Sequence, residues 1–390
     1  MKNNKKFIVF GKPSFNKEEL KAVKKVLDSG WVGMGPRCEE FEKLFAEYVG
    51  AKYAVSVSSC TAALHLALLA ANVGPGDEVI TTTLTFVATT NAIEYAGAKP
   101  VLVDIDPHTL NIDPKLIGAA ITKKTKAIIP VHYGGLPCEM NKIFAIAKKH
   151  GLAVVEDAAH AIASRWKGKM IGGLKNSLAC FSFYPNKNMT SVEGGMVTTD
   201  NKKIAENIKI TRLHGMDNEA WKRYRGGKKI IRSEMVMLGF KYNLTDLQAA
   251  IGICQLKKLE RFQKTREKYA KIYDKCLSEY CDLQKRPEHS SRHAFHLYVI
   301  LLKLENMTAT RDEILQQIRN HGIGATIHYL PVHMHRYYQK KFGFKNGDFP
   351  IAECAYERMI TLPLTPSMSL KDAKKTAETV KRILIANTKK

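Results

Sequence analysis

Short apolar runs alternate with Ala/Leu-rich or amphipathic segments between residues 53 and 157. The runs are rich in β-branched residues and apolar on both faces, as in parallel strands that helices cover on both sides. The segments between them carry helical signals, and one ends in the basic sequence "KKHG", which is typical of a helix C-terminus. This alternation predicts an α/β fold with a mainly parallel sheet. The predicted strands are 53–57, 78–82, 99–105, 126–132 and 152–157, with helices at 61–71 and 140–151.

The pattern changes after about residue 178. The strand-like runs 178–184 and 196–199 have no helix between them, which predicts that they are adjacent strands. Residues 243–281 have a helical period, with Asn243 and Thr245 as capping types. A second α+β unit follows, with strands at 293–302 and 325–330, a helix at 310–322 and a last helix from Lys371. We expect a large domain over residues 1–260 and a smaller C-terminal domain over 261–390.

Composition is ordinary for a globular enzyme, with 45% hydrophobic and 25% charged residues, so the 390-residue chain can build a sizeable core. No apolar run is long enough to span a membrane, and "FIVF" near the N-terminus is too short for a signal peptide. Eight scattered cysteines without a CxxC pair indicate reduced thiols rather than a disulfide framework. We predict a cytoplasmic protein with no membrane partner.

The net charge of +24 is the unusual bulk feature. Nucleic-acid binding can produce such a charge, but the basic residues are spread along the chain, without a long basic tail, a C2H2 pattern or an RNP motif. A solvated, lysine-rich surface explains the charge best, attraction of an anionic small molecule comes next, and nucleic acid comes third. The glycine-rich nucleotide motifs, HExxH and GxSxG are missing, so nucleoside triphosphatase, zincin and serine-hydrolase functions lack support.

Two groups of histidines are candidate metal ligands. No carboxylate or cysteine accompanies them at a recognisable ligand spacing, so we interpret them as polar lining of a pocket and predict no metal. The first group is His289, His293 and His296, and the second is His328, His333 and His335.

Three features could each bind part of one cofactor. Ser58 to Thr61 lie between a predicted strand and a helix, where free N–H groups and the helix dipole attract an anion. Asp157 ends a predicted strand, at the edge where open α/β sheets bind ligands. Lys187 lies in "FSFYPNKNMTSVEGG", a connection between strands that proline and asparagine constrain.

Each feature also has an ordinary structural explanation, since the serines and Asp157 could cap helices and Lys187 could be a solvated turn residue. Together, however, they are the groups that pyridoxal 5'-phosphate needs. The anion cup would hold the phosphate, the carboxylate would keep the pyridine nitrogen protonated, and the lysine would bind the aldehyde carbon as a Schiff base.

With these residues the chain resembles the DegT/StrS family of sugar aminotransferases, which have the aspartate aminotransferase fold of type I pyridoxal phosphate enzymes. The resemblance runs from about residue 10 to the C-terminus. It rests on several stretches, among them "AKYAVSVSSCTAALHLAL", "GDEVITTTLTFVATTNAIEYAGAKPVLVDIDPHTLNID", "VVEDAAHAIAS", "CFSFYPNKNMTSVEGGMV", "GFKYNLTDLQAAIGICQL" and "GATIHYLPVH".

The resemblance implies a role for each matching residue around the cofactor ring. Lys187 would be the covalent lysine and the proton shuttle, and Asp157 would pair with the ring nitrogen. His160 would lie near the phenolic oxygen, and Phe86 would stack on the ring face.

The resemblance also implies how the phosphate, the substrate and a second subunit are bound. Asn243 would reach the phosphate from the partner subunit, which makes a homodimer with shared active sites the functional unit. His328 and Tyr329 match the "HY" motif on the substrate side. The phosphate would be held by Cys60, Thr61 and Ser182.

The departures from the family pattern remove no group that the reaction needs. Cys60 stands where glycine or alanine is frequent, and Asn186 where threonine is frequent. Family members that dehydrate sugars carry histidine in place of the lysine, so Lys187 favours transamination. The stretches "RLHGMDNEAWKRYRGG" and "GFKYNLTD" look most like members acting at C4 of UDP-4-keto sugars, and the basic segment 222–232 suits a nucleotide diphosphate or a solvated loop equally.

The hypothesis is therefore pyridoxal phosphate-dependent transfer of an amino group from L-glutamate to a nucleotide-linked keto sugar, for a surface polysaccharide or glycan. A sugar dehydratase using the same cofactor is one alternative. A non-enzymatic regulator that binds nucleic acid or a partner protein is the other.

Overall fold

The computed structural model describes residues 7–217, 233–287 and 292–389. Its main sheet has seven strands in the order β1-β9-β8-β5-β4-β2-β3. Strand β9 runs antiparallel to β1 and β8, and the other neighbours are parallel. The prediction of a mainly parallel sheet is therefore confirmed, as is the pairing of β8 with β9. The strands are β1 (Tyr53–Val57), β2 (Glu78–Thr82), β3 (Lys99–Val103), β4 (Thr125–Ile129), β5 (Ala153–Asp157), β8 (Leu178–Ser182) and β9 (Gly195–Thr199).

Helices cover both faces of this sheet. Side chains alternate between two cores, so that Val55 and Val57 of β1 pack on one side and Ala54 on the other. Because both faces are buried, the strands are apolar throughout, as the sequence pattern indicated. One face is covered by α3 (Cys60–Ala70), α4 (Ala88–Tyr95) and α7 (Lys202–Thr211). The other is covered by α2 (Pro36–Val49), α5 (Pro114–Ala120), α6 (Met140–His150) and the first half of α9 (Asp246–Leu277).

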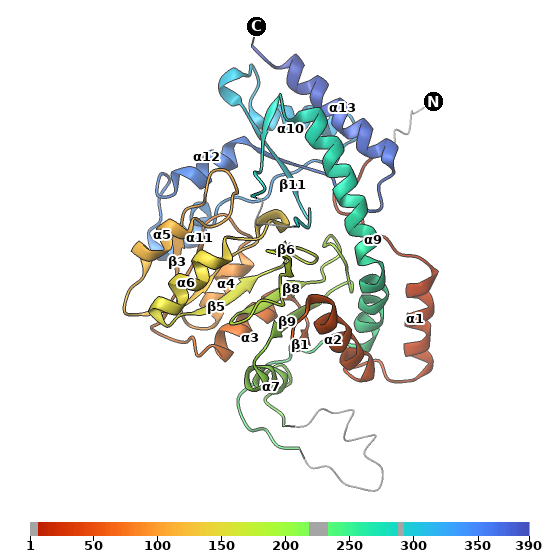
Figure 1. Cartoon of the computed structure of the whole chain (residues 1–390), viewed down its shortest axis with the longest axis vertical. Coiled ribbons are helices and arrows are strands. Elements are labelled where there is room, and N and C mark those ends of the chain that lie inside the picture. Colours follow the sequence, from red (N-terminus) through yellow and green to blue (C-terminus); the bar gives the residue numbers. More distant parts are fainter. Residues whose placement is uncertain (1–6, 218–232, 288–291, 390) are drawn as a thin grey trace.

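Helix α9 joins this layered unit to a second core. Thr245 begins it with a capping box that includes Gln248. In Figure 1, α9 runs along one side of the molecule, with α1 (Lys17–Asp28) and α2 beside one end and α13 (Leu370–Ala386) beside the other. Helix α9 contributes to both cores, and the predicted domain boundary at residue 260 falls inside this helix. The division into two domains at that residue stays a prediction.

The second core packs helices against a three-stranded antiparallel sheet, β10-β11-β12. Its elements are β10 (Cys281–Leu283), β11 (Tyr298–Leu302), α10 (Arg311–Asn320), β12 (Met359–Leu362) and α13. The remaining elements are the hairpin β6 (Arg165–Trp166) and β7 (Lys169–Met170), α11 (Arg336–Phe342), α12 (Pro350–Arg358), and 3-10 turns at Tyr133–Gly135, Leu304–Asn306 and Val332–Met334. No helix in the described ranges combines the length and apolarity that a bilayer crossing needs.

The predicted strand at 325–330 is wrong. Thr326 makes only an isolated bridge to Thr361, and residues 327–330 form no strand. Strand β12 takes the place beside β11 instead. The alternating sequence "ATIHYL" has a β-like period, but its residues His328 and Tyr329 line a cavity rather than a sheet face. Strand β11 is also shorter than predicted, beginning at Tyr298 rather than at residue 293.

Candidate active site

A cavity of about 490 Å³ opens where the parallel strands of the main sheet end, at Asp157 of β5 and Ser182 of β8. This is the edge where open α/β sheets bind ligands, and the volume is typical of a small-molecule site. Nine of the ten predicted site residues line it: Cys60, Thr61, Phe86, Asp157, His160, Ser182, Lys187, His328 and Tyr329.

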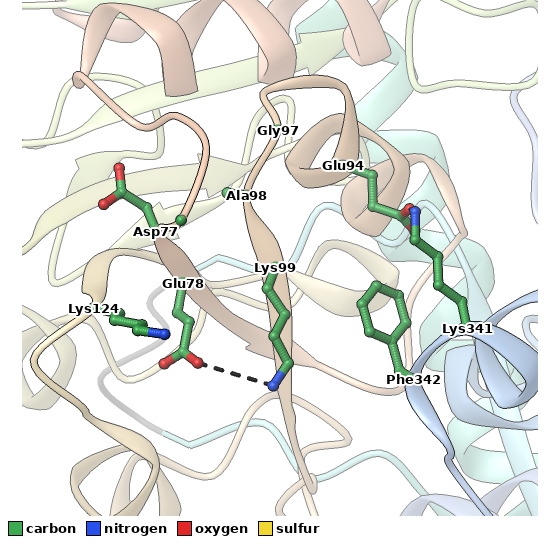
Figure 2. A pocket seen from close by; sticks show the side chains of 10 residues that line it. Asp77, Glu78, Glu94, Gly97, Ala98, Lys99, Lys124, Lys341 and Phe342 are labelled. Carbon is green, nitrogen blue, oxygen red and sulfur yellow. Dashed lines mark hydrogen bonds and ion pairs between the residues drawn. The ribbon is translucent and has the colours of Figure 1, made fainter.

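A second hollow, of about 410 Å³, lies at the opposite edge of the sheet, at the amino ends of β2 and β3 (Figure 2). Four of its charged residues form two ion pairs, since Lys99 lies 3.9 Å from Glu78 and Lys341 bonds to Glu94. It shares no lining residue with the first cavity. We therefore place the candidate active site in the first cavity.

The loop that carries Lys187 is closed by its own backbone. The Phe183 N–H donates to the Gly194 carbonyl at 2.9 Å, and the Lys187 N–H donates to the Tyr184 carbonyl at 3.0 Å. Gly195 follows because a Cβ there would lie 2.4 Å from the Ser59 carbonyl oxygen. The glycine thus lets β9 approach the start of α3, and the lysine loop and the predicted anion cup lie on one wall.

The Lys187 amine is shielded from bulk water, and neutral and acidic groups surround it. Burial lowers its pKa to about 8, while Asp157 favours the charged form. A substantial fraction of neutral amine therefore exists near neutral pH, as a lysine nucleophile requires.

Asp157 faces the same cavity with only 7% of its surface exposed. Thr89 donates a hydroxyl hydrogen bond to one carboxylate oxygen at 2.7 Å, and the Ala159 N–H donates to the other at 3.1 Å. Thr85 in turn donates to Thr89 at 2.8 Å, since the Thr89 proton is already committed. Burial nevertheless raises the pKa of Asp157, so this carboxylate would gain from a cationic ligand.

The residues predicted to form an anion cup lie at the start of α3. Ser59 is the N-cap, and its hydroxyl accepts from the Ala62 N–H at 3.1 Å. The Cys60 thiol points to the Cys180 carbonyl, 3.4 Å away, and burial raises its pKa, so it stays a neutral thiol. The first N–H groups of a helix have no partner within it, which leaves those of Cys60 and Thr61 to bind an anion.

Aromatic residues form the rest of the wall. The Gly134 N–H donates to His160 Nδ1 at 3.3 Å, which places the His160 proton on Nε2, 3.1 Å from the Tyr329 hydroxyl. Phe86 lies 5.5 Å from the Tyr329 ring, and 55% of its surface is exposed. A planar ligand could therefore stack on Phe86 and meet the His160 N–H at its edge.

Asn243 is the predicted residue that does not line this cavity. Its amide donates to the Leu244 carbonyl at 3.1 Å. Its reach into a partner's site stays a prediction.

Sequence reasoning missed Thr89, which holds Asp157. The available signal was its place in "TFVATTNA", which follows β2 at the same edge of the sheet as Asp157.

Of the histidines interpreted as pocket lining, His328 lines the cavity, and the interpretation is wrong for His293, His333 and His335, which do not. His293 bonds to Gln284 at 3.1 Å, and His333 bonds to both Thr83 at 2.7 Å and Glu353 at 2.9 Å. His296 lies 3.4 Å from the Lys187 amine, and His328 lines the cavity. His289 lies outside the described residues, as do residues 222–232 and most of "RLHGMDNEAWKRYRGG".

These residues fit pyridoxal 5'-phosphate. A buried carboxylate with a raised pKa suits a pyridinium, a helix N-terminus suits a phosphate, and a lysine with a lowered pKa suits an aldehyde. With the seven-stranded sheet and the second small sheet, they define a fold type I, pyridoxal phosphate-dependent aminotransferase.

Comparison with known proteins identifies the family. Residues 13–381 match the DegT/DnrJ/EryC1/StrS aminotransferase family, and the chain belongs to it. Over 380 residues it is 47% identical to the spore coat polysaccharide biosynthesis protein SpsC of Bacillus subtilis, covering 97% of each chain. It is also 47% identical over 380 residues to the uncharacterized protein MJ1066 of Methanocaldococcus jannaschii, covering 96% of this chain and 97% of that one.

A solved relative supports the cofactor. The fold is similar to that of Spr1654, a proposed sugar aminotransferase from Streptococcus pneumoniae. Its PMP form has a TM-score of 0.90 at 31% identity, and its PLP form has a TM-score of 0.88 at 30% identity. Both comparisons cover 97% of this chain and 99% of that chain. The enzyme is thus a sugar aminotransferase that uses pyridoxal phosphate.

Proposed function

We propose that this enzyme transfers the amino group of L-glutamate to the keto group of a nucleotide-linked sugar, with a UDP-4-keto sugar as the first candidate. The product would be an amino sugar for a surface polysaccharide, and the similarity to SpsC supports that use. The observation that carries the proposal is the shared cavity, which brings Lys187, Asp157 and the cup at Cys60 and Thr61 together.

The proposed roles follow from these positions. The bound cofactor supplies the electron sink that makes the substrate carbon acidic. Lys187 Nζ would move a proton between the substrate carbon and the cofactor carbon, in both half-reactions. Asp157, oriented by Thr89, would hold a proton on the ring nitrogen, and the His160 Nε2–H, which now faces the Tyr329 hydroxyl, would bind the oxygen at the ring edge. His328 and Tyr329 would contact the sugar.

The nucleotide would lie outside the cavity, whose rim is solvent-exposed. Tyr184 and Phe86 line the cavity with 48% and 55% of their surfaces exposed, and an aromatic rim of this kind can contact a base or a sugar ring. The net charge of +24 favours the approach of a diphosphate.

We also propose that the working form is a homodimer in which Asn243 completes the partner's phosphate site. The segment just before it is apolar but faces water in the single chain, with Met235 63%, Val236 54% and Leu238 81% exposed. Contiguous exposed apolar side chains of this kind indicate an interface.

A panel of keto sugar nucleotides tests the function. The protein with pyridoxal phosphate and L-glutamate should form one 2-oxoglutarate for each amino sugar nucleotide, with ping-pong kinetics. UDP-, dTDP- and GDP-linked 3-keto and 4-keto sugars are compared by mass spectrometry, with the unlinked sugars as controls. Equal turnover of the unlinked sugar would contradict the nucleotide requirement. Ammonia released together with a deoxygenated sugar, and no amino sugar, would instead identify a dehydratase.

The pKa of Lys187 predicts how cofactor capture depends on pH. Since only the neutral amine attacks the aldehyde, the rate at which apo-protein captures pyridoxal phosphate should rise about tenfold per pH unit and level off above pH of about 8. Stopped-flow absorbance between pH 6 and 10.5 measures it. A rate still rising steeply at the high end would mean that the amine keeps its ordinary pKa.

A further inference from the structure

We propose that His296 is a positioning residue for the catalytic lysine: its imidazole Nε2 accepts a hydrogen bond from Lys187 Nζ and holds the free amine at the cavity wall. The two nitrogens are 3.4 Å apart, a long contact of the kind that tightens when a site is filled. The inference rests on the proposed role of Lys187 and adds a residue that does not itself line the cavity.

The backbone before His296 is held at every carbonyl. The carbonyl oxygens of the three preceding residues each accept a side-chain hydrogen bond, at 2.8, 2.8 and 3.0 Å; the donors, in order, are Gln263, Asn188 and Arg266. Asn188 is next to Lys187 in sequence, so its hydrogen bond ties the lysine loop directly to the histidine segment. These hydrogen bonds fix the backbone segment that carries His296 relative to the loop that carries Lys187.

A glycine brings the two histidines of the site together. Gly135 has a φ of +97°, and a Cβ there would lie 2.7 Å from the His160 carbonyl oxygen and 2.9 Å from the Ala294 Cβ. This close approach lets the Ala294 N–H bond to the Gly135 carbonyl at 3.0 Å. The ring centroids of His160 and His296 are then only 4.4 Å apart, with the ring planes tilted by 36°, so the His296 imidazole packs against that of His160.

Electrostatics keeps the His296 ring neutral, as a hydrogen-bond acceptor must be. Its exposed fraction is 4%, and burial holds its pKa well below the ordinary value. The charged and titratable groups that face it (Lys187, His160, Arg266 and His328) all lower its pKa further. Around the Lys187 amine, Asp157 favours the ammonium, and the acceptor at Nε2 adds to that effect.

The second ring nitrogen argues against a packing role. His296 Nδ1 is buried and has no hydrogen-bond partner in the part of the chain that the structure describes. An unpaired polar atom in the interior costs free energy, and an apolar ring would fill the same space without that cost. A phenyl ring at this position would fill the space but could not accept a hydrogen bond from Lys187.

The experiment measures the Lys187 pKa without measuring turnover. Apo-protein variants are mixed with pyridoxal phosphate, and the pH midpoint of the capture rate is recorded. For His296→Phe we expect a midpoint about one pH unit below the wild type, because a hydrogen bond to the charged amine is lost. His296→Gln should stay within about half a unit, because its carbonyl oxygen can still accept.

His293→Gln is the matched control, since His293 is buried in the same segment but bonds to Gln284 instead. Its midpoint should equal that of the wild type. If His296→Phe does not fold, His296→Asn gives the same measurement, because its side chain is too short to reach Nζ and should shift the midpoint as phenylalanine would.

An unchanged midpoint in His296→Phe or His296→Asn would overturn the inference. So would an equal shift in His293→Gln, which would indicate general loosening of the segment. Failure of the proposed role of Lys187 looks different: the wild type itself would capture no cofactor, or Lys187→Ala would capture it as the wild type does.

Discussion

Replacement of Lys187 by alanine is expected to lower the transamination rate by about 10⁴-fold or more, because one amine both captures the cofactor and moves the proton. Acid–base catalysis alone typically contributes 10²–10⁴-fold, and here the covalent step is lost as well. The near-visible absorbance of the lysine-linked cofactor should disappear at the same time. Single-turnover assays with L-glutamate and absorbance spectra of the purified variant measure both effects.

Lys202→Ala is the control for this variant. Its side chain is 71% exposed and pairs with Glu206 on α7, away from the cavity lining. A surface ion pair of this kind contributes little to stability, so activity and absorbance should match the wild type. Turnover that persists in Lys187→Ala would place the reacting amine elsewhere and would remove the basis of the proposed mechanism.

Asp157→Asn is expected to lower the rate by about 10²–10³-fold, the usual cost of removing one fixed electrostatic partner. The amide keeps the shape of the side chain and can still accept from Thr89, but it cannot neutralise a pyridinium. The cofactor should still be captured, because Lys187 is intact. The expected signature is therefore normal absorbance on reconstitution with slow transamination, measured as kcat at saturating L-glutamate.

Asp157→Asn should lower activity without lowering the stability of the apo-protein. Burial raises the folded-state pKa of Asp157 above its unfolded value, so the ionised carboxylate costs stability, and that cost grows as pH rises through the interval between the two values. Asp157→Asn removes the cost, so at pH 7 the apo variant should melt no lower than the wild type. A large fall in Tm would mean that the activity loss reports misfolding rather than chemistry.

Much of the site was predictable because its polar residues lie at strand ends and at a helix start, which the local sequence pattern indicates. Asp157 and Ser182 are the last residues of their strands, and the carboxyl ends of parallel strands meet at one edge. The anion cup was predictable because Ser59 lies at a strand-to-helix junction. By contrast, residues 325–330 alternate like a strand, yet the place beside β11 is taken by β12, whose pairing with β11 is decided by long-range packing.

The alternation of strands and helices, the edge that carries Asp157 and the loop that carries Lys187 can be predicted from the sequence, because they depend on local periodicity and strand ends. The contacts of Thr89 with the Asp157 carboxylate and of His296 with Lys187 arise from long-range packing. The partners are 68 and 109 residues apart in the chain. Such contacts depend on how the β2 edge and the segment before β11 pack against the sheet, which no local pattern records.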